Sequence, residues 1–180
     1  MNLEKLFGSK TKVDILKYLL FKRQGVSMRA LESELERTFP AIKKQIDSLD
    51  ESGILRVEKE SSGFAISIQP SQYEMFKQFF FFALKSALTQ IFESYAIMIE
   101  RYFWGKKFGV PLEMDLIVIY RHMEKPQLEA LKQAIGDIFR DFFIDNISLV
   151  CMSSEERGKR YRLADRFVLQ VMRFFPEMKS

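Results

Sequence analysis

The stretch of the chain from residue 71 to residue 102 contains neither proline nor glycine, and its apolar residues recur at helical spacing. This pattern predicts one long helix over residues 71–102. Its apolar positions are Phe76, Phe79, Phe80, Ala83, Leu84, Ala87, Leu88, Ile91, Phe92 and Tyr95. Because these positions cover several faces, the helix must be buried on more than one side. Two arrangements satisfy this requirement: the helix packs between two domains, or it packs against its copy in a homodimer.

The composition limits the class of protein. The chain has 180 residues, of which 47% are hydrophobic and 29% charged, enough for one ordinary domain or two small ones. Disordered and collagen-like chains are excluded.

Cys151 is the single cysteine, so no internal disulfide is expected, and the first ten residues lack the apolar run of a signal peptide. The most apolar run, residues 79–84, is far shorter than the ~20 residues of a membrane span. We therefore expect a cytoplasmic protein with no membrane partner.

The net charge is +4, and each part of the chain on either side of Gln69 carries +2. This excess is small, so bulk charge alone does not indicate a nucleic-acid-binding protein. Any such function must be argued from where the cations are placed.

The first seventy residues predict three helices and a hairpin. Apolar spacing predicts a helix over residues 11–22. Ser27 can cap a second helix, and Thr38 opens a third with Pro40 in its first turn. In the third helix Ile42, Ile46 and Leu49 face inward, which leaves Lys43 and Lys44 facing outward. Gly53 ends this helix. Residues 54–58 and 64–68 then alternate as strands, joined by a tight turn at Ser61, Ser62 and Gly63.

The order of these elements resembles the winged helix-turn-helix family, and the third helix leads into that family's LxxxGIL pattern at residues 49–55. The resemblance implies that the third helix enters the major groove of DNA while the hairpin contacts the flanking backbone. Double-stranded DNA would be the partner of a two-fold homodimer. The implied DNA-contacting residues are Thr38, Lys43 and Lys44 on the third helix, Arg29 on a phosphate, and Arg56 or Lys59 near the wing. The alternative is that these cations are solvated surface charges on a winged helix used for protein contacts.

The last eighty residues alternate between strands and helices. The pattern predicts a strand ending near Phe103, a strand over residues 115–120, a helix over 127–143, a strand over 147–152 and a helix over 154–174. Such alternation indicates a sheet with helices packed on it.

This region resembles the minimal nucleotidyltransferase domain. The resemblance lies in residues 102–105 followed by residues 113–119, and in a closing strand and helix at residues 147–150, 154–156 and 165–171. Nucleotidyltransferases hold Mg²⁺ on three carboxylates and the phosphates on a Gly-Ser turn. Here Lys106 stands where the serine is expected, Glu113 replaces the first aspartate, Asp115 is kept, and Ser148 falls where a third carboxylate is expected.

The domain is therefore expected to be inactive, with no catalytic residue and no cofactor. Gly105, Lys106 and Lys107 could still bind a nucleotide or another anion as an effector. An active enzyme is the alternative, in which Mg²⁺ would lie on Glu113 and Asp115, both on one face of the strand start. A third possibility is that the domain serves only for dimerisation and partner contact.

Together these patterns predict an α+β protein. Residues 1–69 form a winged-helix DNA-binding domain, residues 70–100 a connecting and dimerisation helix, and residues 101–180 a nucleotidyltransferase-like α/β domain. The expected function is that of a DNA-binding transcriptional regulator. The alternatives are an active Mg²⁺-dependent nucleotidyltransferase recruited by its winged helix, and a protein-interaction module. His122 has no identifiable cysteine or serine partner, so no zinc site or catalytic triad is expected.

Overall fold

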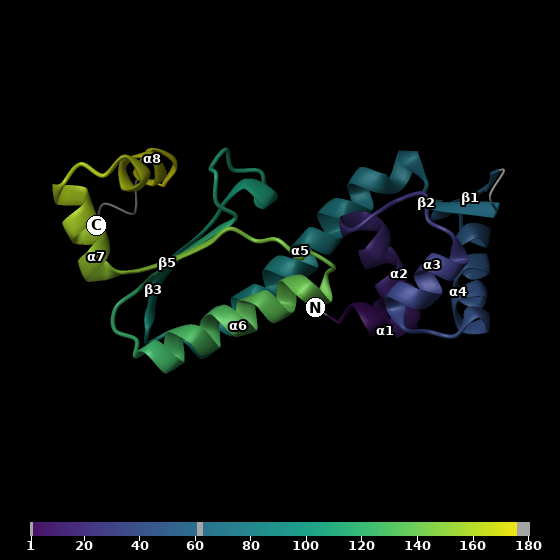
Figure 1. Ribbon diagram of the computed structural model, residues 1–180, viewed down its shortest axis with the longest axis horizontal. Helices are drawn as coiled ribbons and strands as arrows, with labels where there is room; N and C mark the ends of the chain where they lie inside the picture. Colours follow the sequence, from purple (N-terminus) through teal and green to yellow (C-terminus); the bar gives the residue numbers. More distant parts are fainter. Residues whose placement is uncertain (1, 61–62, 176–180) are drawn as a thin grey trace. The chain divides into compact units, whose positions relative to one another are not determined.

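A computed structural model describes residues 2–60 and 63–175 (Figure 1). The chain divides into two compact units. The first comprises Met1–Ala87 with Ile138–Ile144, and the second comprises Leu88–Asp137 with Asp145–Ser180. The sequence boundaries at residues 69 and 100 differ from this division, which falls within the long helix. None of the helices in the described residues is long and apolar enough to cross a membrane.

The first unit begins with four helices, α1 (Leu3–Phe7), α2 (Lys10–Phe21), α3 (Met28–Leu35) and α4 (Phe39–Glu51). Ser27 caps α3 as expected, since its side chain accepts a hydrogen bond from the Ala30 N–H. Thr38 is the N-cap residue of α4, and Pro40 lies in the first turn of that helix. The α4 helix ends just before Gly53, whose φ of 70° is the left-handed conformation that glycine adopts at least cost.

A hairpin follows α4. Strand β1 (Leu55–Glu60) pairs antiparallel with β2 (Gly63–Ile68), with Leu55 opposite Ile68. Val26 adds an isolated bridge to Ile66. In the expected tight turn, Ser61 and Ser62 lie outside the described residues. Helices α2 to α4 and this hairpin give the first unit the winged helix-turn-helix arrangement.

The long helix is shorter than its sequence pattern predicts. Helix α5 runs over Pro70–Ser94, and after a turn the chain enters β3 (Ile99–Trp104). The expectation of helix to residue 102 is therefore wrong. The β-branched and aromatic residues of β3 pair with a strand more than ten residues away, and this pairing outweighs the local helical periodicity. In the first unit, the ring of Phe7 packs on those of Phe76, Phe79 and Phe80 of α5, with centroids 5.7–6.4 Å apart.

The second unit contains a three-stranded sheet in the order β3-β4-β5. Strand β4 (Leu116–Tyr120) pairs antiparallel with β3 and parallel with β5 (Leu149–Ser153). The connection from β3 to β4 contains the short 3₁₀ helix η1 (Lys106–Phe108), and α6 (Lys125–Asp141) leads from β4 toward β5. The mixed α+β character of the chain agrees with its sequence pattern.

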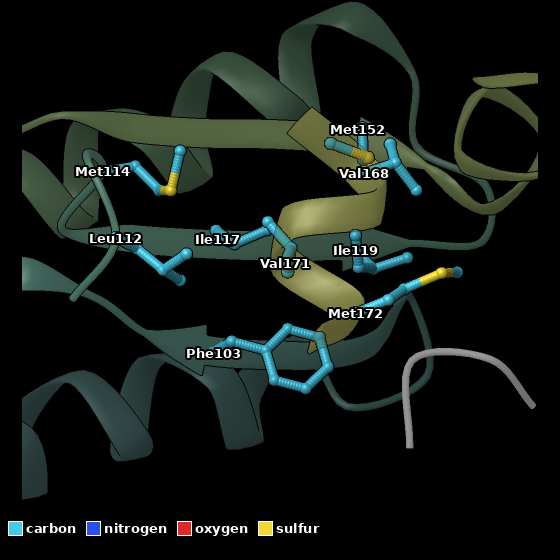
Figure 2. Packing of buried hydrophobic residues seen from close by; sticks show 9 residues of the cluster. All are labelled: Phe103, Leu112, Met114, Ile117, Ile119, Met152, Val168, Val171 and Met172. Carbon is cyan, nitrogen blue, oxygen red and sulfur yellow. The ribbon is translucent and has the colours of Figure 1, made fainter. Parts of the chain in front are cut away.

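One face of this sheet packs on the last helix. Figure 2 shows side chains of α8 (Arg166–Phe174) lying across side chains of the three strands. The buried cluster consists of Phe103, Leu112, Met114, Ile117, Ile119, Met152, Val168, Val171 and Met172. On the opposite face the ring of Tyr102 stacks on that of Phe92 of α5, with centroids 4.2 Å apart.

The single helix expected over residues 154–174 is wrong. It is two helices, α7 (Ser154–Arg162) and α8, separated by a turn in which Ala164 has a φ of 52°. Asp165 starts α8 by accepting a hydrogen bond from the Val168 N–H at 3.0 Å. The break changes the chain direction, and this lets Val168, Val171 and Met172 reach the sheet.

Candidate functional site

The exposed face of α4 is the first candidate site. Ile42, Ile46 and Leu49 are buried, which confirms the expected inward face of the helix. Lys43 and Lys44 consequently point to solvent, and both are exposed. The winged-helix arrangement thus presents two adjacent cations on its third helix, at the positions expected from the sequence.

Acidic side chains partly neutralise this face. The Lys43 ammonium lies 2.6 Å from an Asp47 carboxylate oxygen one helical turn along, and both side chains are about half exposed. A shallow depression of about 380 Å³ runs over this part of α4, lined by Pro40, Lys43, Lys44, Asp47, Ser48 and Glu51. The exposed face of α4 therefore carries both positive and negative side chains. Within the described residues, Lys43 forms an ion pair and Lys44 does not.

The start of α4 is held by α3. A Glu32 carboxylate oxygen accepts a hydrogen bond from the Phe39 N–H at 3.0 Å. A carboxylate at this position also compensates the positive end of the helix dipole. The Thr38 side chain makes no capping hydrogen bond, although Thr38 is the N-cap residue. Its hydroxyl is therefore not used for capping.

The remaining expected DNA contacts lie on α3 and β1. Arg29 is exposed on α3, and Arg56 and Lys59 are exposed on β1. Arg56 forms an ion pair with Glu58 at 2.5 Å, with both side chains about half exposed. An exposed pair of this kind contributes little stability, so Arg56 can exchange Glu58 for another anion at small cost.

The second candidate site surrounds Asp115, which is only 5% exposed. Its carboxylate accepts hydrogen bonds from the Ser148 N–H at 2.9 Å and from the Lys107 N–H at 3.3 Å. The Lys107 ammonium lies 3.5 Å away. This carboxylate therefore already has protein donors on both oxygens, as a buried charge requires.

Glu113 lies two residues before Asp115 and is exposed, and both precede β4. In the described residues no group of three or more His, Cys, Asp or Glu side chains could hold a metal ion. A Mg²⁺ site on Glu113 and Asp115 stays a prediction. To bind the ion, the Asp115 carboxylate would have to give up hydrogen bonds from the Lys107 or Ser148 N–H.

Gly105 lies where the backbone before η1 meets the backbone before β4. Its N–H donates to the Asp115 carbonyl at 2.8 Å, and the Lys106 N–H donates to the Met114 carbonyl at 2.8 Å. The close approach of the two backbones is sufficient to explain why residue 105 is a glycine, and no bound phosphate is needed for that explanation. Lys106 is exposed and Lys107 is half-buried. An anion site at Gly105, Lys106 and Lys107 stays a prediction, with Lys106 as its accessible cation.

A groove that sequence analysis did not identify lies in the second unit. It has a volume of about 580 Å³ and is lined by Thr89, Phe92, Glu93, Ala96, Phe175 and every residue of β3. The sequence signal for this groove is the aromatic run Tyr102-Phe103-Trp104. Sequence analysis placed this run at the end of a helix and of a strand, and used it for the resemblance to nucleotidyltransferases.

No family model matches the chain, and no curated protein is similar to it at a significant level. Among solved structures, the chain is similar to reduced HlyU from Vibrio cholerae, with 21% sequence identity and a TM-score of 0.36. The similarity covers 42% of this chain and 79% of the HlyU chain.

Proposed function

We propose that this protein binds double-stranded DNA through its first unit and acts as a transcriptional regulator. The observation that carries the proposal is the arrangement of α4 within a winged helix. This helix buries Ile42, Ile46 and Leu49 and exposes Lys43 and Lys44. A helix of 13 residues such as α4 fits the major groove of DNA. The hairpin of β1 and β2, whose strand β1 contacts α4, can then reach the DNA backbone beside the groove.

In this proposal the residues that contact DNA lie on three elements. Thr38, Lys43 and Lys44 contact DNA from α4, and the free hydroxyl of Thr38 is a donor for a phosphate oxygen. Arg29 contacts a phosphate from α3. Arg56 and Lys59 contact the backbone from the wing. Because the face also carries acidic groups, we expect moderate affinity with a clear salt dependence.

We infer that the regulator is a homodimer through α5. In the first unit, Met75 and Phe82 lie seven residues apart on this helix and are 62% and 64% exposed. Leu6 of α1, 61% exposed, adds to the apolar surface of the same unit. Large exposed apolar side chains at heptad spacing fit a second copy of the same helix, and a two-fold dimer matches paired DNA half-sites.

For the second unit we propose a regulatory and not a catalytic role. The exposed Lys106, next to Gly105 and Lys107, would attract a nucleotide or another anion as an effector. The engagement of Asp115 by Ser148 and Lys107 supports this choice over an active Mg²⁺-dependent nucleotidyltransferase, which needs free carboxylate oxygens.

The DNA-binding proposal is tested by fluorescence anisotropy with a pool of random duplex DNA at low and moderate salt. The variant Lys43→Ala/Lys44→Ala should bind more weakly, and the slope of log affinity against log salt should fall by about 2. The control Lys125→Ala/Lys159→Ala removes the same charge from exposed positions of the second unit and should bind like wild type. Equal losses in both variants would show a nonspecific charge effect and contradict the proposal.

A further inference from the structure

The first turn of α4 carries an apolar side chain to which the proposed DNA contacts give no role. Phe39 is the first residue of this helix, and its side chain remains 39% exposed. Pro40, the next residue, is exposed as well. A single exposed apolar residue is common on protein surfaces, so the place of Phe39 within the candidate site must carry the argument.

Phe39 and Pro40 stand in front of the two cations of α4. Phe39 lies four residues before Lys43, and Pro40 lies four residues before Lys44, which is one helical turn in each case. Pro40 also lines the same shallow depression as both lysines. The exposed face of α4 therefore begins with an apolar end and continues with cations. Cations suit the phosphates of DNA, and an apolar end suits the apolar parts of the base edges.

The backbone at Phe39 is held in place by α3. The Glu32 carbonyl accepts a hydrogen bond from the Arg37 N–H at 3.2 Å, and the Glu32 carboxylate accepts one from the Phe39 N–H at 3.0 Å. The Arg37 guanidinium lies 3.4 Å from the Asp14 carboxylate, which ties the same turn to α2. The Phe39 backbone is thus fixed before any DNA is bound, so little ordering is needed when the ring meets a ligand.

The position of Phe39 favours a base over a phosphate. When the third helix of a winged helix lies in the major groove, its first residues reach the base edges. The apolar group that the major groove presents is the C5-methyl group of thymine, and phenylalanine is one of the side chains that contact it. A phosphate is disfavoured here, because the Phe39 N–H already donates to the Glu32 carboxylate and that negative charge repels a second one.

We propose that Phe39 is a specificity-determining residue, which contacts the C5-methyl group of thymine in the major groove. The inference rests on the proposed DNA binding through α4 and deepens it: Lys43 and Lys44 supply affinity for any duplex, and Phe39 supplies a preference for thymine at one position. Removing one methyl group from such a contact lowers affinity by about fourfold. Uracil lacks only this methyl group and pairs with adenine in the same way, so it is the matched probe.

The test compares two preparations of the same duplexes by fluorescence anisotropy. Duplexes that the wild-type protein retains from a random pool are amplified once with thymidine triphosphate and once with deoxyuridine triphosphate. Wild type should bind the uracil duplexes at least about fourfold more weakly than the thymine duplexes. Equal affinities would overturn the proposal. Because this comparison uses the unchanged protein, its outcome does not depend on whether a variant folds.

Variants then assign the preference to Phe39. In Phe39→Ala the ratio of the two affinities should fall to about one, and Phe39→Leu, which keeps an apolar side chain, should retain most of it. Phe174→Ala is the matched control, because Phe174 is 38% exposed and belongs to the second unit. This control should keep the wild-type ratio. A ratio that is unchanged in Phe39→Ala would overturn the proposal, since another residue would then contact the methyl group.

The lysine variant separates this inference from the proposal on which it rests. Lys43→Ala/Lys44→Ala should weaken the binding of both duplex preparations by the same factor, because their phosphates are identical. If wild type binds neither preparation, DNA binding and the thymine contact both fail. If wild type binds both equally and the lysine variant loses affinity, only the thymine contact is overturned. A Phe39 ring that inserts between base pairs would give this second result, with Phe39→Ala weakening both preparations alike.

Discussion

The backbones of Gly105 and Met114 approach so closely that a Cβ atom on residue 105 would lie 1.9 Å from the Met114 carbonyl oxygen. The nearest atoms are backbone atoms of a buried segment, so a side chain at position 105 cannot be accommodated by a rotamer change. This contact holds the loop before η1 against the residues that lead into β4.

Gly105→Ala should therefore lower the free energy of unfolding by about 3 kcal/mol, because the two backbone segments must separate. Urea unfolding followed by circular dichroism measures the effect. Gly158→Ala in α7 is the matched control, since its Cβ would meet no atom closer than 3.8 Å, and it should be neutral or stabilising. Equal effects of the two substitutions would contradict the close contact at Gly105.

An ion pair between a buried lysine and an exposed aspartate in the first unit predicts an asymmetry between its two partners. Lys17 is 6% exposed, donates a hydrogen bond to Asp141, and lies 4.3 Å from the centre of the Phe142 ring. Asp141→Ala leaves this ammonium buried without its carboxylate and should cost about 2 kcal/mol. Lys17→Met removes the charge and keeps the apolar stem, so it should cost less than about 1 kcal/mol. Urea unfolding of both variants measures the two losses of unfolding free energy. A larger loss in Lys17→Met than in Asp141→Ala would contradict the prediction.

Asp14 predicts a pH dependence of stability. Burial raises the pKa of its carboxyl above the ordinary value of 3.8, although Arg37 lies 3.4 Å away and opposes the shift. The folded chain thus holds this proton more tightly than the unfolded chain. The resulting stabilisation is present below pH 3.8 and is lost as the pH rises through the raised pKa.

Asp14→Asn removes this titration. The stability of wild type relative to Asp14→Asn should therefore fall as the pH is raised from acid to neutral. Urea unfolding at a series of pH values measures the difference, and most other titrating groups cancel in it. A difference that is constant with pH would show that the carboxyl is not perturbed.

Cys151 should react slowly with alkylating reagents. Burial raises the pKa of its thiol to about 11, from an ordinary value of 9.0. At neutral pH the reactive thiolate is then about a hundred times scarcer than in an ordinary cysteine. The rate of reaction with iodoacetamide should keep rising with pH up to about 11. In urea the rate should become that of a free cysteine, and an equally slow reaction there would point to a cause other than burial.

Asp47 should restrain DNA binding. Its carboxylate holds the Lys43 ammonium at 2.6 Å, on the face proposed to meet DNA. Asp47→Asn frees that cation and removes a negative charge, so duplex affinity should rise several-fold at low salt and less at higher salt. Asp137→Asn on α6 is a control with the same charge change. An affinity that does not change in Asp47→Asn would argue against α4 as the DNA-contacting helix.

Much of the first unit could be predicted from the sequence because its signals are local. The Ser27 cap and the position of Pro40 mark where helices begin, and the spacing of Ile42, Ile46 and Leu49 identifies the buried face of α4. These features depend on residues within a few positions of one another. The exposure of Lys43 and Lys44 follows from the same periodicity.

The sequence by itself thus determined helices α2 to α4, the hairpin and the outward face of α4. Only tertiary structure decided that α5 stops at Ser94, that the last helix breaks before Asp165, and that Asp115 is buried among donors from Lys107 and Ser148. It also decided that β3 is an outer strand of the sheet within the described residues and that it lines a groove. The physical reason is that strand pairing and burial join residues far apart in the chain, and their combined free energy outweighs local helical preference.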